Sequence, residues 1–587
     1  MADSDAEAGS PLIPCASLLP LTLEGVRECS RDPFWRRVRV ALLLSLFVLW
    51  VALVATATAG AVHHYPCAPR PGAERVRRDA LDGLLYRVEA GDLGDGALRG
   101  LISNLDYISE LGVNIVCLSS IYKSPHKSFG YDVEDFKAVD PDFGTMDTFK
   151  ELVSEMKKRG LRLVLDLVPN HTSNKHMWFQ KSINRTDPYT DYYIWVAPSK
   201  YDAEGKPLPP NNWMSLTGGS VWEYNEQRKE FYLHQFSIEQ PDLNFNNEHV
   251  FQEFMEIFNF WLDLGVNGFS LDAVLYLFED SQLRDEPLTV AEGQLTGKNI
   301  SYDSLNHIYT RNLPENLKIL GALKDHLEDY SNKSDGLPRL LMTGFYDAEN
   351  ETEKYYKNSS KPLVDLVFNF LLVSHLNSSS SANDVMNAIS LWLDKLPSGI
   401  NANWMIGNNG QRRVADRFGS NMVDGMNMIA LLLPGIAITY CGDEIGMEGT
   451  PMSKNTSRNA AQLLSSKNDP FVNAKSQEAA HSHLNVYKQL SKAREEPAIK
   501  YGHLEMKVLN GSVFAFTRHE PGFPMYLVAV NWSEENVLVD FGEFSYVSER
   551  ATVYVHSTGS LRIDLDIKDI HAVHLDPKEG MVLIFQS

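Results

Sequence analysis

Polar side chains that can act as acids, bases or ligands stand where several apolar runs of this chain end. Asp166, Asn170 and His171 follow one run in the sequence DLVPNH, and Asp272 follows another in GFSLDAV. A third group, QPDLN, carries Asp242 a short distance before the second run. Carboxylates that a fold brings together can act as acid, base or nucleophile. The elements that carry these residues therefore decide which chemistry is open to the chain.

Strand-like apolar runs alternate with helical patterns from about Leu84 onward. Phe149, Leu152 and Met156 fall at helical spacing, and Gly160 follows them as the end of a helix. The eight predicted strands are Leu84–Val88, Val113–Ser120, Leu161–Val168, Gly268–Val274, Leu340–Tyr346, Leu363–Phe370, Asn403–Gly407 and Gly435–Tyr440. Strands that alternate with helices form parallel sheets, and eight of them predict a closed (β/α)8 barrel, with its chemistry at the C-terminal strand ends.

Two further regions depart from the barrel pattern. The interval after the third strand is too long for a structureless loop, so we predict an inserted subdomain over 171–245. After residue 498 the chain is rich in short β-like runs with turns between them, which predicts a C-terminal antiparallel β-sandwich over 499–587. The barrel is then assigned to 81–170 and 246–498.

An uncharged apolar stretch, Val40–Val62, precedes the barrel. As a helix it is long enough to cross a hydrocarbon core of about 30 Å. Arg36, Arg37 and Arg39 at its first end favour a cytoplasmic N-terminus. We therefore predict a cytoplasmic tail over 1–39, a single transmembrane helix over 40–62, a stalk over 63–80, and an extracellular remainder at the plasma membrane. The alternative is a cleaved signal peptide, but the apolar core of such a peptide is shorter, about 7–15 residues.

The net charge and the cysteine count limit the kinds of partner that the chain can bind. The formal net charge is −22, which argues against nucleic acid because phosphate binding needs clustered cations. Five cysteines are present, and Cys15 and Cys29 lie before the apolar stretch, where thiols stay reduced. Cys67, Cys117 and Cys441 lie after it, and this odd number leaves one thiol to be explained.

The chain resembles the α-amylase superfamily of glycoside hydrolases in four short sequences taken together, DLVPNH, GFSLDAV, QPDLN and GYDV. QPDLN is similar to its oligo-1,6-glucosidase branch. Such an enzyme needs a nucleophile and an acid, two carboxyl groups about 5–5.5 Å apart. The resemblance places Asp272 at the nucleophile position.

The same resemblance finds other residues replaced. It puts Phe345 at the position of the acid, Gly410 at that of a third carboxylate, and Ser270 at that of an arginine. These replacements imply a degenerate site, and we predict that the chain is not an enzyme. The alternative is that Asp347 or Glu349 supplies the acid after a shift of register.

A membrane-anchored chain of this kind also resembles the heavy subunits of heteromeric amino-acid transporters. The sequences TDYYIW, PPNNW and NWMIG, and the serine of GFSLDAV, are similar to the rBAT-like branch of that group. The resemblance implies a non-catalytic type II membrane glycoprotein that carries a multi-pass light subunit to the cell surface, with a dimer of heterodimers as a further form. The alternatives are a surface-anchored α-glucosidase and an adhesion or receptor ectodomain.

In that group, a cysteine just outside the membrane bonds the light subunit, and Cys67 holds this place. Its alternative is an internal bridge to Cys117, which falls in a predicted barrel strand, or to Cys441, which directly follows one. Ten Asn-X-Ser/Thr sequons follow the apolar stretch. We predict glycosylation at Asn184, Asn299, Asn332, Asn350, Asn358, Asn377, Asn455, Asn510 and Asn531.

The tenth sequon, Asn170, is predicted to stay unmodified because the resemblance implies a structural calcium ion there. The implied ligands are the side chains of Asn170, Asp242 and Glu279 and the backbone carbonyls of Tyr276 and Leu277. Carboxylate, amide and carbonyl oxygens suit Ca²⁺. The alternative is that Asn170 caps a turn and Asp242 solvates its loop.

Overall fold

The structure is a computed structural model that divides into two compact units, Met1–Arg78 and Asp79–Ser587. It describes residues 37, 40–47, 50, 83–93, 96–289, 301–345, 351–356, 362–449, 470–475, 477, 481–560, 562 and 564–586. Residues 40–47 are helical, but among the described residues no helix is both long and apolar enough to cross a membrane. The predicted tail, the predicted stalk and most of the predicted span Val40–Val62 lie outside the described residues.

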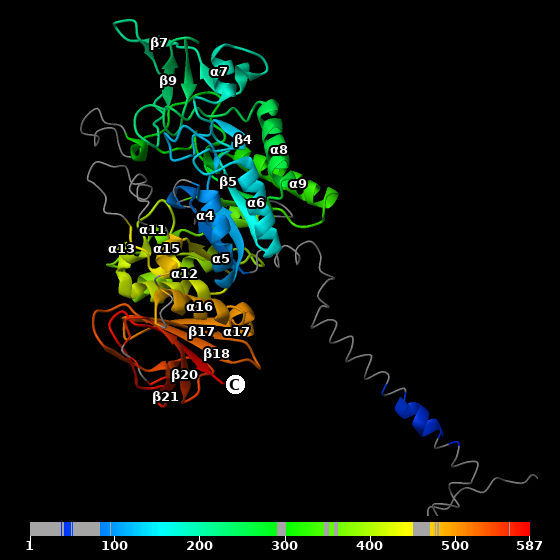
Figure 1. Ribbon diagram of the computed structural model, residues 1–587, viewed down its shortest axis with the longest axis vertical. Helices are drawn as coiled ribbons and strands as arrows, with labels where there is room; N and C mark the ends of the chain where they lie inside the picture. The colour runs from blue at the N-terminus through cyan, green and yellow to red at the C-terminus, as the bar shows by residue number, and fades with distance from the viewer. Residues whose placement is uncertain are drawn as a thin grey trace, which may run out of the picture. The chain divides into compact units, whose positions relative to one another are not determined.

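The second unit is built on an eight-stranded parallel sheet, so the predicted barrel is confirmed (Figure 1). Its strands lie in the order β13-β12-β11-β5-β2-β1-β15-β14. Their bounds are β1 Leu84–Val88, β2 Val113–Leu118, β5 Arg162–Leu167, β11 Gly268–Leu271, β12 Leu340–Gly344, β13 Leu366–Phe368, β14 Asn403–Met405 and β15 Ile436–Tyr440. All eight fall inside the runs predicted from the sequence.

Side chains alternate between the inside and the outside of the barrel, as the pleat of a strand requires. On β1, Leu85 belongs to the small apolar cluster that fills the barrel, whereas Tyr86 and Val88 belong to the larger core around it. Leu85 shares the inner cluster with side chains such as Ile115, Val164 and Ile438. This cluster forms the floor on which the inward-facing polar residues lie.

A buried amide joins the two strands at the ends of the hydrogen-bonded order. Asn403 on β14 accepts a hydrogen bond from the backbone N–H of Asn369 (2.8 Å) and donates one to the carbonyl of Val367 (2.8 Å). The Asn369 side chain in turn donates to the Asn403 carbonyl (3.0 Å). Asn403 and Asn369 are both buried, so these bonds close the barrel between β13 and β14 without a regular ladder.

We expect Asn403→Ala to lower the free energy of unfolding by about 2–4 kcal/mol, because it leaves a buried N–H and a buried carbonyl without partners. Thermal and urea unfolding of the purified protein measure this loss. Asn246→Ala, at an exposed turn residue, is the control and should change stability by less than about 0.5 kcal/mol. Equal stability of the two variants would show that the amide does not close the barrel.

Helices and short turns connect the barrel strands. They are α4 Ala97–Ser103, α5 Leu105–Glu110, α6 Met146–Lys158, α8 Glu248–Asp263, α9 Pro314–Lys333, α10 Thr352–Tyr356, α11 Leu371–Ser374, α12 Ala382–Lys395, α13 Val414–Phe418, α14 Val423–Leu432, α15 Pro470–Lys475, α16 His483–Ala493 and α17 Pro497–Tyr501. On α6 the Thr145 side chain caps the first turn, Phe149, Leu152 and Met156 are buried, and Gly160 takes φ 71° just after the end.

Additional elements follow β5, in the stretch 171–245 for which the inserted subdomain was predicted. They include α7 Met177–Ile183, β6 Trp195–Val196, β7 Lys200–Tyr201, β8 Pro207–Leu208, β9 Trp222–Asn225 and β10 Glu230–Leu233. Strands β6, β10 and β9 form an antiparallel sheet over a small core that includes Trp213, Trp222 and Phe231. A separate hairpin, β3 Tyr122–Lys123 with β4 Asp135–Val139, follows β2.

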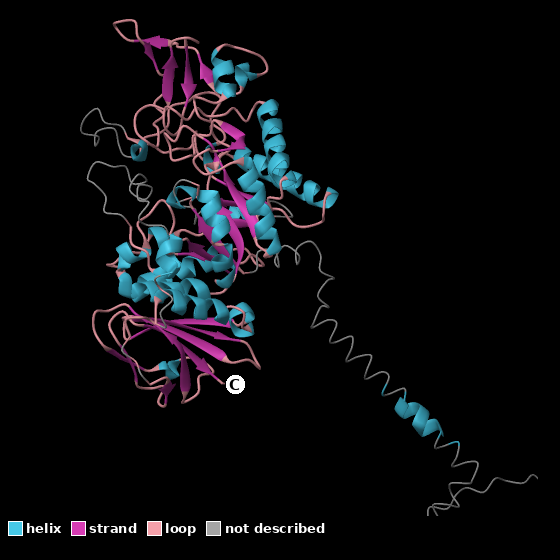
Figure 2. Cartoon of the chain, viewed as in Figure 1, coloured by secondary structure: helices cyan, strands magenta, loops and turns pink. Residues whose placement is uncertain are grey.

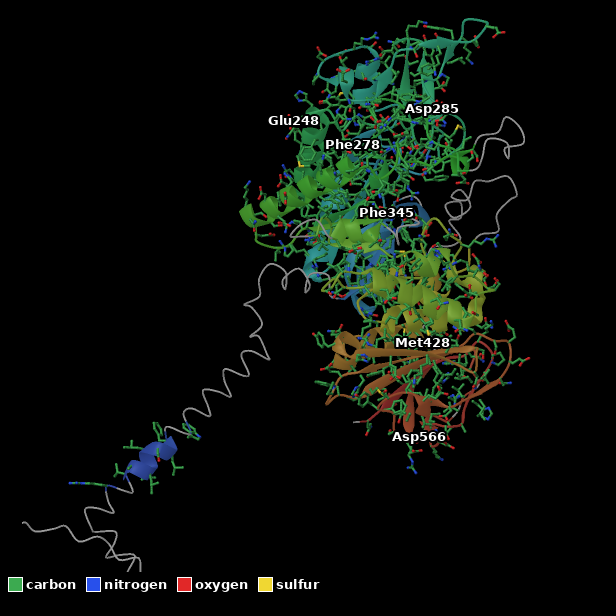
Figure 3. All side chains as sticks on the ribbon, turned by 180° about the vertical axis from the view of Figure 1, so that it is seen from behind. Glu248, Phe278, Asp285, Phe345, Met428 and Asp566 are labelled. Carbon is green, nitrogen blue, oxygen red and sulfur yellow. The ribbon has the colours of Figure 1, made fainter. Side chains whose placement is uncertain are left out.

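The C-terminal region is an antiparallel β domain, shown in magenta beneath the helices in Figure 2. A six-stranded sheet has the order β16-β17-β18-β23-β20-β21, and β19 pairs with β22. The bounds are β16 His503–Leu509, β17 Val513–His519, β18 Met525–Asn531, β19 Val537–Val539, β20 Ala551–His556, β21 Asp566–Ile567, β22 Val573–Leu575 and β23 Gly580–Phe585. Helix α14 packs on this sheet, and Figure 3 labels Met428 on its side nearest the strands.

Candidate functional site

An ion pair lies above the apolar floor of the barrel. Arg87 and Asp166 come from β1 and β5, and Arg87 Nη2 lies 2.5 Å from Asp166 Oδ2 while its Nη1 donates to Oδ1 over 3.4 Å. The Tyr131 hydroxyl donates to Asp166 Oδ2 (3.2 Å), and the Cys117 thiol lies 3.6 Å from Oδ1. Asp166 is therefore fixed in place by three neighbours.

Asp272 stands at the C-terminal mouth of the barrel, directly after β11. Ala273 takes a left-handed conformation (φ 56°), and its N–H donates to Asp272 Oδ1 over 2.8 Å. The side chain is exposed to solvent, yet the surrounding protein desolvates it enough to raise its pKa, and the charge of Asp166 adds to this effect. Asp272 is thus a positioned and accessible carboxylate, as a nucleophile must be.

The other positions that the sequence singled out carry no carboxylate. Ser270 is buried on β11, two residues before Asp272. Phe345 is buried after β12, its ring 4.9 Å from that of Tyr355, and Figure 3 labels it in the body of the barrel. Gly410 donates its N–H to Asn408 Oδ1 (3.0 Å). The alternative acids, at 347 and 349, lie outside the described residues.

Glu89 is a carboxyl group at this mouth that the sequence analysis missed. It follows β1 and faces the same way as Arg87, whose Nε lies 3.4 Å from Glu89 Oε1. The side chain is buried, and this burial raises the pKa of Glu89 to about 7, although the charge of Arg87 opposes the shift. No motif marks Glu89, and its inward direction follows only from counting alternate residues from Leu85.

A second group of oxygen atoms lies where the barrel meets the inserted subdomain. Asn170 donates to Asp242 Oδ1 (3.1 Å), and Gln235 Nε2 donates to both Asp242 Oδ2 (2.9 Å) and the Tyr276 carbonyl (2.8 Å). Asn170 and Asp242 are each 1% exposed. The Asn170 Oδ1 atom is buried and accepts no hydrogen bond within the described part of the chain.

The carboxyl groups of Asp242, which is buried, and Glu279, which is partly buried, lie here, and no cationic side chain of the described residues acts on either. Burial raises the pKa values of Asp242 and Glu279 to about 8, and the charge of Asp242 adds to the shift at Glu279. A divalent cation would compensate both carboxylates and would give the orphaned Asn170 oxygen a partner. The predicted ligands Asn170, Asp242, Tyr276 and Glu279 therefore fit a calcium ion.

Comparison with known proteins decides the family. The model of the α-amylase catalytic domain matches residues 86–473. The chain belongs to the α-amylase family. Among solved structures it is similar to the α-glucosyl transfer enzyme XgtA, with 27% identity and a TM-score of 0.70, over 86% of this chain and 99% of that one.

Three relatives are similar over most of the chain. Maltase 1 of Drosophila virilis is 37% identical over 85% of this chain and 84% of its own length. The α-glucosidase of Culex pipiens is 33% identical over 84% of this chain and 87% of its own. The amino acid transporter heavy chain SLC3A1 of Rattus norvegicus is 37% identical over 84% of this chain and 75% of its own.

These relatives correct two predictions made from the sequence. The chain was expected to be a transporter subunit and not an enzyme, but the maltases and α-glucosidases contradict both expectations, because they match most of the chain at 32–37% identity. The inference rested on the replaced residues Phe345, Gly410 and Ser270. Replacement of these three positions was taken to mean that the chain has no activity. Other carboxyl groups at the mouth of the barrel, such as Glu89, were not considered.

The predicted disulfide and glycosylation residues lie partly inside and partly outside the described residues. Cys67 lies outside the described residues, as do Asn299, Asn350, Asn358 and Asn455, so the intermolecular disulfide and those four sugars stay predictions. Cys117 and Cys441 are buried free thiols. Asn184, Asn332, Asn377 and Asn510 are exposed. Asn531 is 0% exposed and donates to the carbonyls of Glu535 and Asp576, so glycosylation predicted there does not fit the structure.

Proposed function

We propose that the chain is an α-glucosidase, a hydrolase that releases glucose from α-glucosides. The observation that carries the proposal is Asp272, an exposed carboxylate held by the Ala273 N–H at the C-terminal end of β11. Relatives named as maltases and α-glucosidases over most of the chain support it. In this role Asp272 attacks the anomeric carbon and forms a glucosyl ester, so the reaction retains the anomeric configuration.

The ion pair beside Asp272 supports the binding of a sugar. Asp166 is held by Arg87 and by the Tyr131 hydroxyl, so a rigid polar wall lies above the apolar floor of the barrel. Rigid charged and hydroxyl groups can bind sugar hydroxyls without reorganising during the reaction. We propose that Arg87, Tyr131 and Asp166 hold the glucosyl group that Asp272 attacks.

We also propose that the enzyme works at the outer face of the plasma membrane. The uncharged stretch Val40–Val62 supports an anchor with the N-terminus inside, and the exposed sequons Asn184, Asn332, Asn377 and Asn510 support a glycosylated outer part. A calcium ion bound by Asn170, Asp242 and Glu279 and by the carbonyls of Tyr276 and Leu277 would tie the inserted subdomain to the barrel. It has a structural role in this proposal.

Glucose release by the full-length purified protein in detergent tests the proposed activity. We expect turnover of maltose and other α-glucosides and no turnover of the β-linked cellobiose, because Asp272 can attack only from the face opposite an α-linked leaving group. Protein carrying Asp272→Asn serves as the blank for contaminating enzymes. Equal release by the two proteins on every α-glucoside would contradict the proposal.

A further inference from the structure

We propose that Glu89 donates the proton to the leaving oxygen in this reaction and later takes a proton from the attacking water. The inference rests on the proposed α-glucosidase function. It assigns the acid and base role to the end of β1, because the position after β12 is occupied by Phe345, whose side chain has no proton to give.

The barrel pleat places Glu89 on the inner face. Leu85 lies in the cluster that fills the barrel, Arg87 two residues on pairs with Asp166 across the interior, and Glu89 follows two residues later at the mouth. Asp272 stands in the same relation to Ser270 on β11, where Ser270 is in register with Asp166. Both carboxyl groups therefore point inward just beyond the C-terminal ends of their strands.

The neighbours of Glu89 link it to Asp272. The charges of Arg87 and Asp166 shift the pKa values of both Glu89 and Asp272. The charges of these two carboxylates in turn raise the pKa of the Tyr131 hydroxyl. One oxygen of Glu89, Oε1, is buried and accepts no hydrogen bond from the described residues, and Arg87 Nε lies 3.4 Å from it. Asp272 is the accessible, ionisable partner that such an acid needs.

The charged surroundings of Glu89 favour the protonated form near neutral pH. The groups that face it are Arg87, Asp92, Ser119, Cys117, Tyr131, Asp166 and Tyr440. Burial acts most strongly and raises the pKa of Glu89 to about 7, while Arg87 and a hydrogen bond from Ser119 lower it. A general acid works best when its pKa lies near the working pH.

Asp443 is the rival carboxyl group at this end of the barrel. Its two oxygens accept no hydrogen bond in the described chain, and burial raises its pKa to about 7. However, Gly407 packs against this carboxylate so closely that a Cβ there would lie 2.2 Å from Asp443 Oδ2. The charges that act on Asp443 are those of Arg413, Glu444 and Arg417, whereas Arg87 and Asp166 act on both Glu89 and Asp272. Asp443 is thus enclosed and does not share the charged neighbours of the nucleophile.

The two steps balance with Glu89 in this role. In the first, the Asp272 carboxylate bonds to the anomeric carbon, the bond from that carbon to the leaving oxygen breaks, and the Glu89 proton moves to that oxygen. In the second, water bonds to the anomeric carbon and gives a proton to the Glu89 carboxylate while the glucosyl ester of Asp272 breaks. Glucose leaves, and both side chains return to their first states.

The variant Glu89→Gln tests the assignment. We expect kcat/KM for maltose to fall about 10²–10⁴-fold, the usual worth of a general acid. α-Glucosyl fluoride needs no proton on its leaving group, so its first step should be nearly unchanged. Azide should speed the second step and give α-glucosyl azide, because azide needs no base. Glu223→Gln, at an exposed residue of β9, is the control and should match the wild type.

The wild-type pH profile gives a second test that needs no variant. Glu89 must be protonated in the free enzyme, so kcat/KM for maltose should fall as pH rises through about 7, the pKa of Glu89. The same profile for α-glucosyl fluoride should lack this fall. A fall that is identical for both substrates would assign the titration to some other step and would overturn the inference.

The outcomes separate this inference from the proposed function. A wild-type chain without turnover overturns both. Turnover of maltose that Glu89→Gln leaves unchanged overturns the inference alone, and so does a selective loss of maltose activity in Asp443→Asn, Asp347→Asn or Glu349→Gln with Glu89→Gln unaffected. A wild-type value of kcat/KM for α-glucosyl fluoride, which reports the first step alone, shows that the Glu89→Gln variant is folded.

Discussion

Replacing Asp272 with Asn should lower kcat for maltose by about 10⁴-fold or more, the scale on which removal of a nucleophile acts in hydrolases. The amide cannot form the glucosyl ester, so the route through a covalent intermediate closes. The Ala273 N–H can still donate to the amide oxygen, so the local backbone conformation should survive. Initial rates of glucose release, with the melting temperature as a check of folding, measure the effect.

Azide makes the Asp272→Asn experiment specific for a nucleophile. With α-glucosyl fluoride and azide, the variant should form β-glucosyl azide, because azide attacks the face that Asp272 used. Asp303→Asn, at an exposed residue, is the matched control and should keep wild-type rates. Residual maltase activity within tenfold of the wild type would show that Asp272 is not the nucleophile.

Removal of calcium should lower the melting temperature of the full-length protein. An ion that binds only the folded state stabilises it by RT ln(1 + [Ca]/Kd), about 2.7 kcal/mol at a hundredfold excess over Kd. That free energy corresponds to a fall of about 5 °C when the ion is chelated. Added Ca²⁺ should reverse the fall, and scanning calorimetry with and without chelator measures it.

The variant Asp242→Asn locates the calcium response. It removes the charge of one ligand while keeping its shape, so its melting temperature should no longer depend on the chelator. Asp303→Asn should respond as the wild type does. If the wild type melts at the same temperature with and without chelator, or if Asp242→Asn still responds fully, Asn170, Asp242 and Glu279 do not hold a calcium ion.

The barrel could be predicted because parallel strands are buried on both faces and appear as continuous apolar runs, as Ile436–Tyr440 does. The role of Asn403 in closing the barrel could not, because a polar residue in a short strand has no pattern that names its partners. Its hydrogen bonds to Val367 and Asn369 depend on how β13 and β14 approach each other.

Residues of the candidate site could be predicted from the sequence only where they lie in a recognisable motif. Asp272, Asn170 and Asp242 lie in short sequences with recognisable spacing, and the structure brings Asn170 and Asp242 within hydrogen-bond distance. Glu89 follows β1 in a stretch without such a motif, where a charged residue reads as the solvated end of a strand. Its raised pKa depends on burial among side chains from other strands, which sequence spacing does not report.

Trapping of the covalent intermediate tests the central claim most directly. 5-Fluoro-α-glucosyl fluoride reacts through its good leaving group, while the ring fluorine slows hydrolysis of the ester that forms. We predict that the intact full-length protein gains one 5-fluoroglucosyl group and that proteolysis places it on the peptide containing Asp272, with no adduct in Asp272→Asn. No adduct on the wild type, or an adduct on another carboxylate, would contradict an α-glucosidase with Asp272 as its nucleophile.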